Sequence, residues 1–98
     1  MADSTIWKTS APVADRITLE IPEGSTMLSV ADQRGGGGTL DFWFIADPSQ
    51  LNKETRTIQV YGTGHPIPPD ALTTCVPLGT VVTAGGSLVW HVFLEGDK

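Results

Sequence analysis

The residues best suited to chemistry form a nine-residue segment from Tyr61 to Pro69, which holds two glycines, three prolines, one histidine and one tyrosine. Glycine lets a backbone N–H approach a ligand closely, proline fixes the path of the chain, and imidazole donates, accepts or carries charge near neutral pH. This composition, directly after a predicted strand, predicts a rigid binding loop. A loop tip needs no histidine for packing, so we expect His65 to contact the ligand.

Known glycine-rich phosphate motifs do not explain this segment. Gly62-Thr63-Gly64 matches the start of a dinucleotide-binding motif, but the third glycine is absent and the following prolines exclude the required helix. The Gly-Lys-Ser or Gly-Lys-Thr sequence of P-loop proteins is also absent. The run Gly35 to Gly38 is interpreted as a flexible hairpin tip. A phosphate-binding loop is the alternative, and it is disfavoured because such loops usually lead into a helix and none is predicted here.

Residues for metal binding or catalysis are few. The soft ligands are His65, Cys75 and His91, and their spacing matches no zinc motif, so no metal is expected. Cys75 has no activating neighbour in the sequence and is interpreted as a structural thiol, buried or exposed. The carboxylates near predicted turns are assigned to solubility and turn formation; they are Asp41, Asp47, Glu54 and Asp70. We therefore expect a protein that is not an enzyme and needs no cofactor.

Nucleotide binding suits the residues better. Aromatic faces, a few cations and backbone amides are what a nucleotide pocket needs. The aromatic candidates are Trp7, Trp43, Tyr61 and Trp90, and the cations are Lys8, Arg16, Arg34 and Arg56. Trp43 and Trp90 are expected in the core, whereas Trp7 stays open between core and ligand stacking. His91 is interpreted as a half-buried, hydrogen-bonded histidine, with the polar anchor of a pocket as the alternative.

Length, charge and composition limit the class of protein. The chain has 98 residues, which suits one domain over residues 1–98. The net charge is −5 and only six residues are Lys or Arg, so duplex DNA or RNA is not an expected partner. A small anionic ligand remains compatible, because it needs only one or two cations. The sequence has no apolar run of ~20 residues, no secretory signal at its start and one cysteine, which predicts a cytosolic protein with no membrane contact.

The elements that must position these residues are predicted to be strands. Period-two segments recur about every ten residues between Pro, Gly, Asn and Asp, which is typical of an all-β sandwich or barrel. About seven strands are expected, over residues 5–9, 15–21, 26–33, 39–46, 55–63, 79–83 and 87–94. One helical turn is considered within residues 47–54 and another within residues 68–72.

Two of these segments, residues 40–45 and 88–93, are apolar on both faces. Such strands lie at the centre of a sheet or bury their second face against another subunit. A chain this short then has more apolar surface than one small core covers, so we expect a homo-oligomer, such as a tetramer.

Three segments resemble a family of small proteins of unknown function encoded by tailed bacteriophages and prophages. They are Ile6-Trp7-Lys8, the YGTGHPIP sequence from Tyr61 to Pro68, and the GSLVWHVF sequence from Gly86 to Phe93. Some phage proteins of this size and all-β type are similar to immune-evasion sponges, which bind cyclic di- or trinucleotide signals of the host's antiphage defence (CBASS) without cleaving them. The resemblance therefore implies an anti-CBASS sponge in the host cytoplasm, with its pockets formed by an oligomer. Gly35 to Gly38 is longer than the corresponding turn of relatives, so no role is transferred to it.

At matching positions, the resemblance implies roles for particular residues. Trp7 would stack on a base and Lys8 would supply charge to a phosphate. The backbone cradle would consist of Tyr61, Gly62, Thr63, Gly64, His65 and Pro66, with His65 also donating from its side chain. Arg56 is a second candidate cation. The alternatives are a phage structural or protein-interaction module and, ranked last, an enzyme that degrades such signals.

Overall fold

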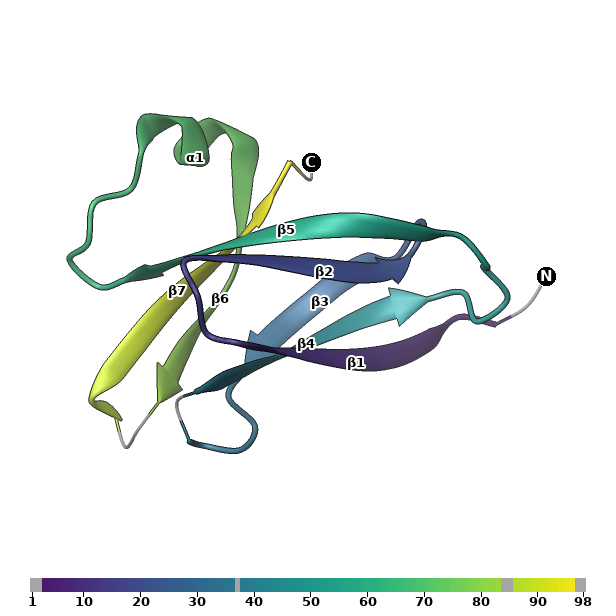
Figure 1. Cartoon of the computed structure of the whole chain (residues 1–98), viewed down its shortest axis with the longest axis horizontal. Coiled ribbons are helices and arrows are strands. Elements are labelled where there is room, and N and C mark those ends of the chain that lie inside the picture. The colour runs from purple at the N-terminus through teal and green to yellow at the C-terminus, as the bar shows by residue number, and fades with distance from the viewer. Residues whose placement is uncertain (1–2, 37, 84–85, 97–98) are drawn as a thin grey trace.

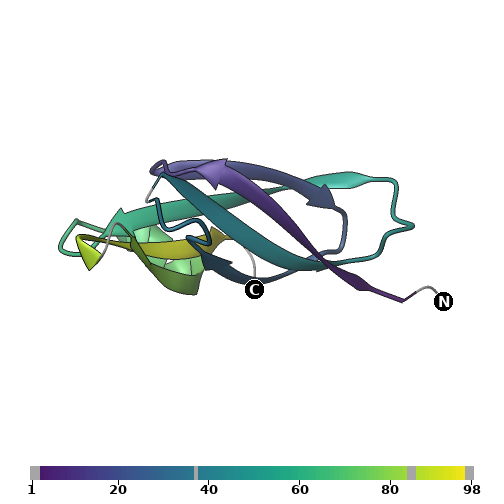
Figure 2. The ribbon, with the colours of Figure 1, turned by 90° about the horizontal axis from the view of Figure 1, so that it is seen from below.

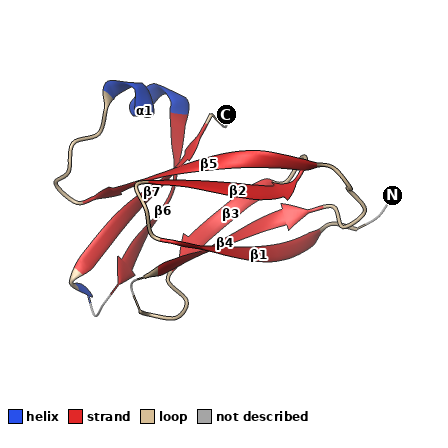
Figure 3. Cartoon of the chain, viewed as in Figure 1, coloured by secondary structure: helices blue, strands red, loops and turns tan. Residues whose placement is uncertain are grey.

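The computed structural model describes residues 3–36, 38–83 and 86–96. These residues form seven strands in two antiparallel sheets and one short α-helix (Figure 1, Figure 3). In chain order the elements are β1 (Thr5–Pro12), β2 (Arg16–Pro22), β3 (Thr26–Ala31), β4 (Thr39–Ala46), β5 (Lys53–Gly62), α1 (Pro69–Thr74), β6 (Cys75–Thr83) and β7 (Leu88–Glu95). The predicted all-β class is confirmed.

The two sheets stack as an open sandwich and do not close into a barrel. The smaller sheet has the strand order β1-β4-β3, and the larger sheet has the order β2-β5-β7-β6. The molecule measures 45 × 31 × 16 Å along its principal axes, and the short dimension is that of two sheet layers (Figure 2). At one side of the sandwich β3 packs against β6, where a Cβ on Gly79 would lie 3.2 Å from Val30 Cγ1.

The core forms because one face of each strand is apolar. In β2, Ile17, Leu19 and Ile21 are all buried, whereas the residues that alternate with them are exposed, as the sequence predicts. The inward residues of β4, β5 and β7 complete the core from both sheets; they include Leu40, Phe42, Phe44, Ile58, Val60, Val92 and Leu94. The interior is therefore one continuous cluster shared by the two sheets.

The two segments that are apolar on both faces are central strands, as predicted. β4 lies between β1 and β3, and β7 lies between β5 and β6. On the outer side of β4, Trp43 and Ile45 are half-buried. On the outer side of β7, His91 and Phe93 are half-buried, in register with β5. Both strands are therefore central in their sheets, while their outer faces are only partly buried.

The boundaries differ from the prediction mainly at β6. This strand begins at Cys75, before the predicted start at Gly79, and includes Pro77 with an irregularity in its pairing between Pro77 and Gly79. Proline is tolerated there because β6 is an edge strand in its sheet. Residues 32–38 connect the antiparallel pair β3 and β4, so this segment is a hairpin connection, although Gly37 lies outside the described residues.

The predicted helical turn near residues 68–72 is confirmed as α1, which has a proline at its start. Residues 47–50 instead form a hydrogen-bonded turn, in which Gln50 N donates to Asp47 O, and no helix is seen between residues 47 and 54. Among the described residues, no helix is long and apolar enough to cross a membrane.

Candidate binding cleft

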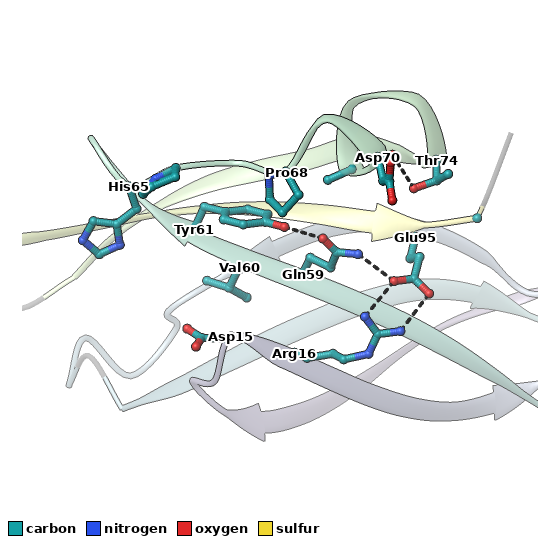
Figure 4. A pocket seen from close by; sticks show the side chains of 13 residues that line it. Asp15, Arg16, Gln59, Val60, Tyr61, His65, Pro68, Asp70, Thr74 and Glu95 are labelled. Atoms are coloured by element: carbon teal, nitrogen blue, oxygen red, sulfur yellow. Dashed lines mark hydrogen bonds and ion pairs between the residues drawn. The ribbon is translucent and has the colours of Figure 1, made fainter.

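An open cleft of about 870 Å³ lies where β5 ends and the chain enters the proline-rich segment (Figure 4). Its walls come from the start of β2, the end of β5, residues 65–68, α1 and the end of β7. Its polar and aromatic lining residues include Arg16, Gln59, Tyr61, His65, Asp70 and Glu95. The loop predicted to bind a ligand therefore forms one wall of a real cavity.

The loop after β5 is a tight turn. Gly62 O accepts a hydrogen bond from His65 N at 3.0 Å, and Gly64 has a φ angle of +87°. A positive φ at the third position of a four-residue turn favours glycine, as in a type II turn. Thr63, at the second position, places its hydroxyl 2.7 Å from His91 Nε2 and so ties the turn to β7. The Gly-Thr-Gly sequence is thus explained first by the shape of the turn.

The His65 ring folds back over Gly62. A Cβ placed on Gly62 would lie 2.9 Å from both Cε1 and Nδ1 of His65, so the ring occupies the space that any other residue would need. His65 is exposed, and it lines both the large cleft and a smaller cavity of about 220 Å³. The imidazole is therefore positioned by the turn and open to a ligand.

Four polar side chains form a continuous chain of contacts across the cleft (Figure 4). Tyr61 Oη donates to Gln59 Oε1 at 2.5 Å, and Gln59 Nε2 donates to Glu95 Oε2 at 2.6 Å. Arg16 holds both oxygens of Glu95, with Nη2 to Oε1 and Nη1 to Oε2 each at 3.0 Å. A bidentate pair of this kind fixes the orientation of the carboxylate, and the amide of Gln59 and the hydroxyl of Tyr61 are oriented in turn.

Tyr61 supplies the aromatic wall. Its ring meets Phe93 edge to face, with centroids 5.8 Å apart and an interplanar angle of 75°. Burial, with a smaller contribution from the nearby Cys75 thiol, raises the pKa of Tyr61 above its ordinary value. The hydroxyl therefore remains protonated at neutral pH and keeps its role as donor to Gln59.

The opposite wall is α1, which is fastened to the end of β7. Gly96 N donates to Thr74 O at 2.6 Å, and Ala71 is buried beneath the helix. Thr74 Oγ1 donates to the backbone oxygen of Asp70 at 2.8 Å. These contacts leave the Asp70 carboxylate exposed at the cleft, without a hydrogen-bond partner among the residues that the structure describes.

The sequence left open whether three residues belong to the core or to a pocket. His91 is half-buried between two hydroxyls, Thr63 at 2.7 Å and Thr80 at 3.3 Å, which agrees with the hydrogen-bonded histidine that the sequence favoured. Trp90 packs against the core and also borders the smaller cavity. Trp43 is half-buried on the outer face of the smaller sheet, so the expectation of a core position for it is only partly met.

Trp7 and Lys8 are not brought to the loop. Both lie on β1 in the smaller sheet, and neither lines the two cavities described above. Trp7 is half-buried against the core and meets Phe44 edge to face at 6.4 Å. Lys8 Nζ donates to Gln33 Oε1 at 2.8 Å. The six residues from Tyr61 to Pro66 lie together, whereas Trp7 and Lys8 lie in the other sheet.

Arg56 also lies apart from the loop, near the other end of β5. Its guanidinium contacts Glu54 Oε2 at 2.6 Å and donates to Ser25 O, and its side chain is 14% exposed. The Glu54 carboxylate in turn accepts a hydrogen bond from Gly24 N, and these contacts hold the pKa of Glu54 below its usual value. Arg56 thus joins β5 to the turn between β2 and β3 and is engaged within the fold.

No sequence pattern indicated Gln59 or Glu95, and Arg16 was predicted only as one of several candidate cations. These residues come from three strands and meet because Arg16 is in register with Gln59 while β7 follows β5 in the sheet. The cleft carries three carboxylates, Asp15, Asp70 and Glu95, against one guanidinium. Within the described ranges, no group of three or more His, Cys, Asp or Glu side chains is arranged to hold a metal ion.

Comparison with known proteins gives a family and no function. No curated protein and no solved structure matches the chain. The model of a domain of unknown function, DUF7352, matches residues 2–98. Since this match covers nearly the whole chain, the protein belongs to the DUF7352 family.

Proposed function

We propose that this protein is a non-catalytic binding protein whose ligand occupies the cleft beside Tyr61 and His65. The observation that carries the proposal is the ordered polar chain from Tyr61 through Gln59 and Glu95 to Arg16, which lines a cavity of about 870 Å³. Cavities of roughly 300–1,000 Å³ with an aromatic wall and a few fixed polar groups are typical of small-molecule sites. Groups that already hold one another lose little freedom when a ligand arrives, which favours tight binding.

The proposed ligand is a cyclic di- or trinucleotide, which the protein sequesters as a phage immune-evasion sponge of the anti-CBASS kind. Support comes from the resemblance of the YGTGHPIP segment to phage proteins and from the site itself. The Tyr61 ring offers a stacking face, and His65 and the outward N–H groups of Arg16 offer donors to a phosphate. In this proposal Trp7, Lys8 and Arg56 have no ligand role, because the structure places them elsewhere.

Thermal unfolding with a panel of linear and cyclic nucleotides tests this proposal. A ligand that binds only the folded state at about 100 times its Kd stabilises the protein by about 2.7 kcal/mol, which raises the melting temperature by several degrees. We expect a shift for a cyclic nucleotide that is lost in His65→Ala and kept in Leu51→Ala, a change at a residue that is 90% exposed and outside the cleft. Ligand released by heat should be chemically intact; turnover would overturn the sponge and favour the enzyme.

A protein-interaction or structural module is the second candidate. It is favoured by the outer face of the smaller sheet, where Ile6 is 61% exposed and pairs with half-buried Ile45 beside Trp43. Finding the protein in purified phage particles, together with no melting shift across the nucleotide panel, would favour this function over the sponge.

A further inference from the structure

The hydrogen-bonding groups of the cleft are unevenly divided between donors and acceptors. Tyr61 Oη and Thr74 Oγ1 each donate their single hydrogen within the protein, to Gln59 and to the backbone oxygen of Asp70. Each hydroxyl can therefore only accept a hydrogen bond from a ligand. Arg16 and Gln59 take three of the four lone-pair positions of Glu95, which leaves one on Oε1, and Asp70 adds a carboxylate with no described partner. Acceptors therefore dominate the surface between Tyr61 and α1.

The donors that remain are few and come from Gln59, His65 and Arg16. Gln59 has one N–H left after its bond to Glu95, and His65 has one in its neutral form. Arg16 directs one N–H from each terminal nitrogen at Glu95, and its side chain is 61% exposed. The cation and its carboxylate largely cancel each other, so Asp70 sets the sign of the charge that a ligand meets near Tyr61.

We infer that the cleft recognises its ligand through N–H donors on the ligand, an amine, an amidine or the amino-bearing edge of a nucleobase, with the ligand against the Tyr61 ring and its N–H groups toward Asp70 and Glu95. Figure 4 shows these two carboxylates at the same side of the Tyr61 ring. Phosphates of a nucleotide would then face outward, toward His65 and the exposed side of Arg16. The part of this inference that concerns nucleotides rests on the proposed function. The preference for a ligand with N–H donors rests only on the residues that line the cleft.

Matched ligands test the inference by calorimetry. We would compare the cyclic dinucleotide of guanosine with that of inosine, which differ by one exocyclic amino group on each base. We expect the inosine ligand to bind at least about tenfold more weakly than the guanosine ligand, because a carboxylate of the cleft loses the amino group that donates to it. Agmatine, an amine with a guanidinium and no phosphate, serves as the second probe and should bind measurably.

Matched variants locate the acceptor. Asp70→Asn should weaken binding of agmatine and of the guanosine ligand about fivefold or more, and affect the inosine ligand less. Glu23→Gln is the matched control: it removes the same charge at a residue outside the cleft and should leave binding within about twofold. Melting curves without ligand show whether each variant folds.

The outcomes separate the inference from the proposed function. Equal binding of the guanosine and inosine ligands with no effect of Asp70→Asn overturns the inference and leaves the nucleotide function in place. Binding of agmatine that depends on Asp70, with no nucleotide bound, overturns the nucleotide function and supports the inference. If neither agmatine nor any nucleotide of the panel binds the folded wild-type protein, both the inference and the proposed function are overturned.

Discussion

Gly62 and His65 are coupled because the imidazole lies where a side chain of residue 62 would be. Gly62, at the end of β5, is paired with Trp90 of β7 and does not have a positive φ. The clash with the His65 ring is therefore what makes alanine unfavourable at this position. The turn sequence thus does two things at once: it shapes the loop, and it sets the imidazole against the cleft. Sequence composition predicts the loop but not this contact.

Gly62→Ala should therefore change the free energy of unfolding differently with and without the His65 side chain. In His65→Ala, where the ring is gone, alanine should stabilise the protein by about 0.4–1 kcal/mol, because it restricts the unfolded chain. With His65 present, the gain should disappear or reverse. Urea unfolding of the four proteins measures this coupling. Gly64→Ala is the control and should destabilise the protein by about 1–2 kcal/mol whether or not His65 is present, because Gly64 has a positive φ. Equal effects of Gly62→Ala with and without His65 would contradict the contact between the His65 ring and residue 62.

Asp41 is a second residue whose environment makes a measurable prediction. It is fully buried and accepts hydrogen bonds from Ser10 Oγ and from Gln33 N at 3.0 Å. The bond from Ser10 contributes most to lowering the pKa of Asp41, burial opposes it, and the Gln33 amide and nearby Lys8 and Arg34 add to the lowering. The ionised carboxylate is therefore the form that stabilises the fold.

Because the pKa of Asp41 is lower folded than unfolded, its contribution is complete above the unfolded value of about 3.9 and is lost as pH falls through the folded value. Asp41→Asn should thus cost about 1–3 kcal/mol at pH near 7 and progressively less in acid. Urea unfolding of both proteins at neutral and at strongly acidic pH measures the difference. A difference that stays constant with pH would contradict the proposed role of the charge.

At the scale of elements, the strands and the loop could be predicted from the sequence, but the face of the sheet on which several side chains lie could not. Alternation in β2 marks its buried face, and the two segments apolar on both faces are the central β4 and β7. The face on which Arg56 lies depends on strand pairing: it is opposite the buried Leu19 and so lies inside the sandwich. Glu95 and Gln59 were missed for the same reason, since only register brings them to Arg16.

The placement of Arg56 predicts a loss of stability without a loss of binding. Arg56→Met keeps the length and the apolar stem of the side chain but removes the guanidinium from Glu54 and from Ser25 O, and Glu54 retains only the Gly24 amide, so we expect a cost of about 2–3 kcal/mol, less than that of a fully buried pair. Five residues along a strand separate Arg56 from Tyr61 by about 16 Å, so ligand affinity should be unchanged.

Chemical unfolding and calorimetry on the folded variant measure these two effects separately. Lys53→Met is the control on the same strand, at an exposed residue, and should change neither. A weaker ligand affinity in Arg56→Met at a temperature where it is folded would restore the phosphate role that the sequence suggested.

At the scale of the whole molecule, the open question is whether the chain acts alone. The core is continuous, and residues of one chain line the cleft. The outer face of the smaller sheet is different: Ile6, Trp43 and Ile45 form an apolar surface over β1 and β4, and we refer to these three residues as the outer patch. Its burial against a second copy would account for the oligomer predicted from the sequence.

Light scattering at micromolar concentration tests this prediction, with the monomer at 10.4 kDa as the reference mass. We expect a multiple of that mass for the wild type and a shift toward the monomer for Ile6→Asp, because a carboxylate in the outer patch would be buried without a partner. Leu51→Asp introduces the same charge at a 90% exposed residue outside the patch and should keep the oligomer. A monomeric wild type would contradict the prediction. Because residues of one chain line the cleft, ligand binding should survive in Ile6→Asp, so that loss of assembly and loss of the site can be told apart.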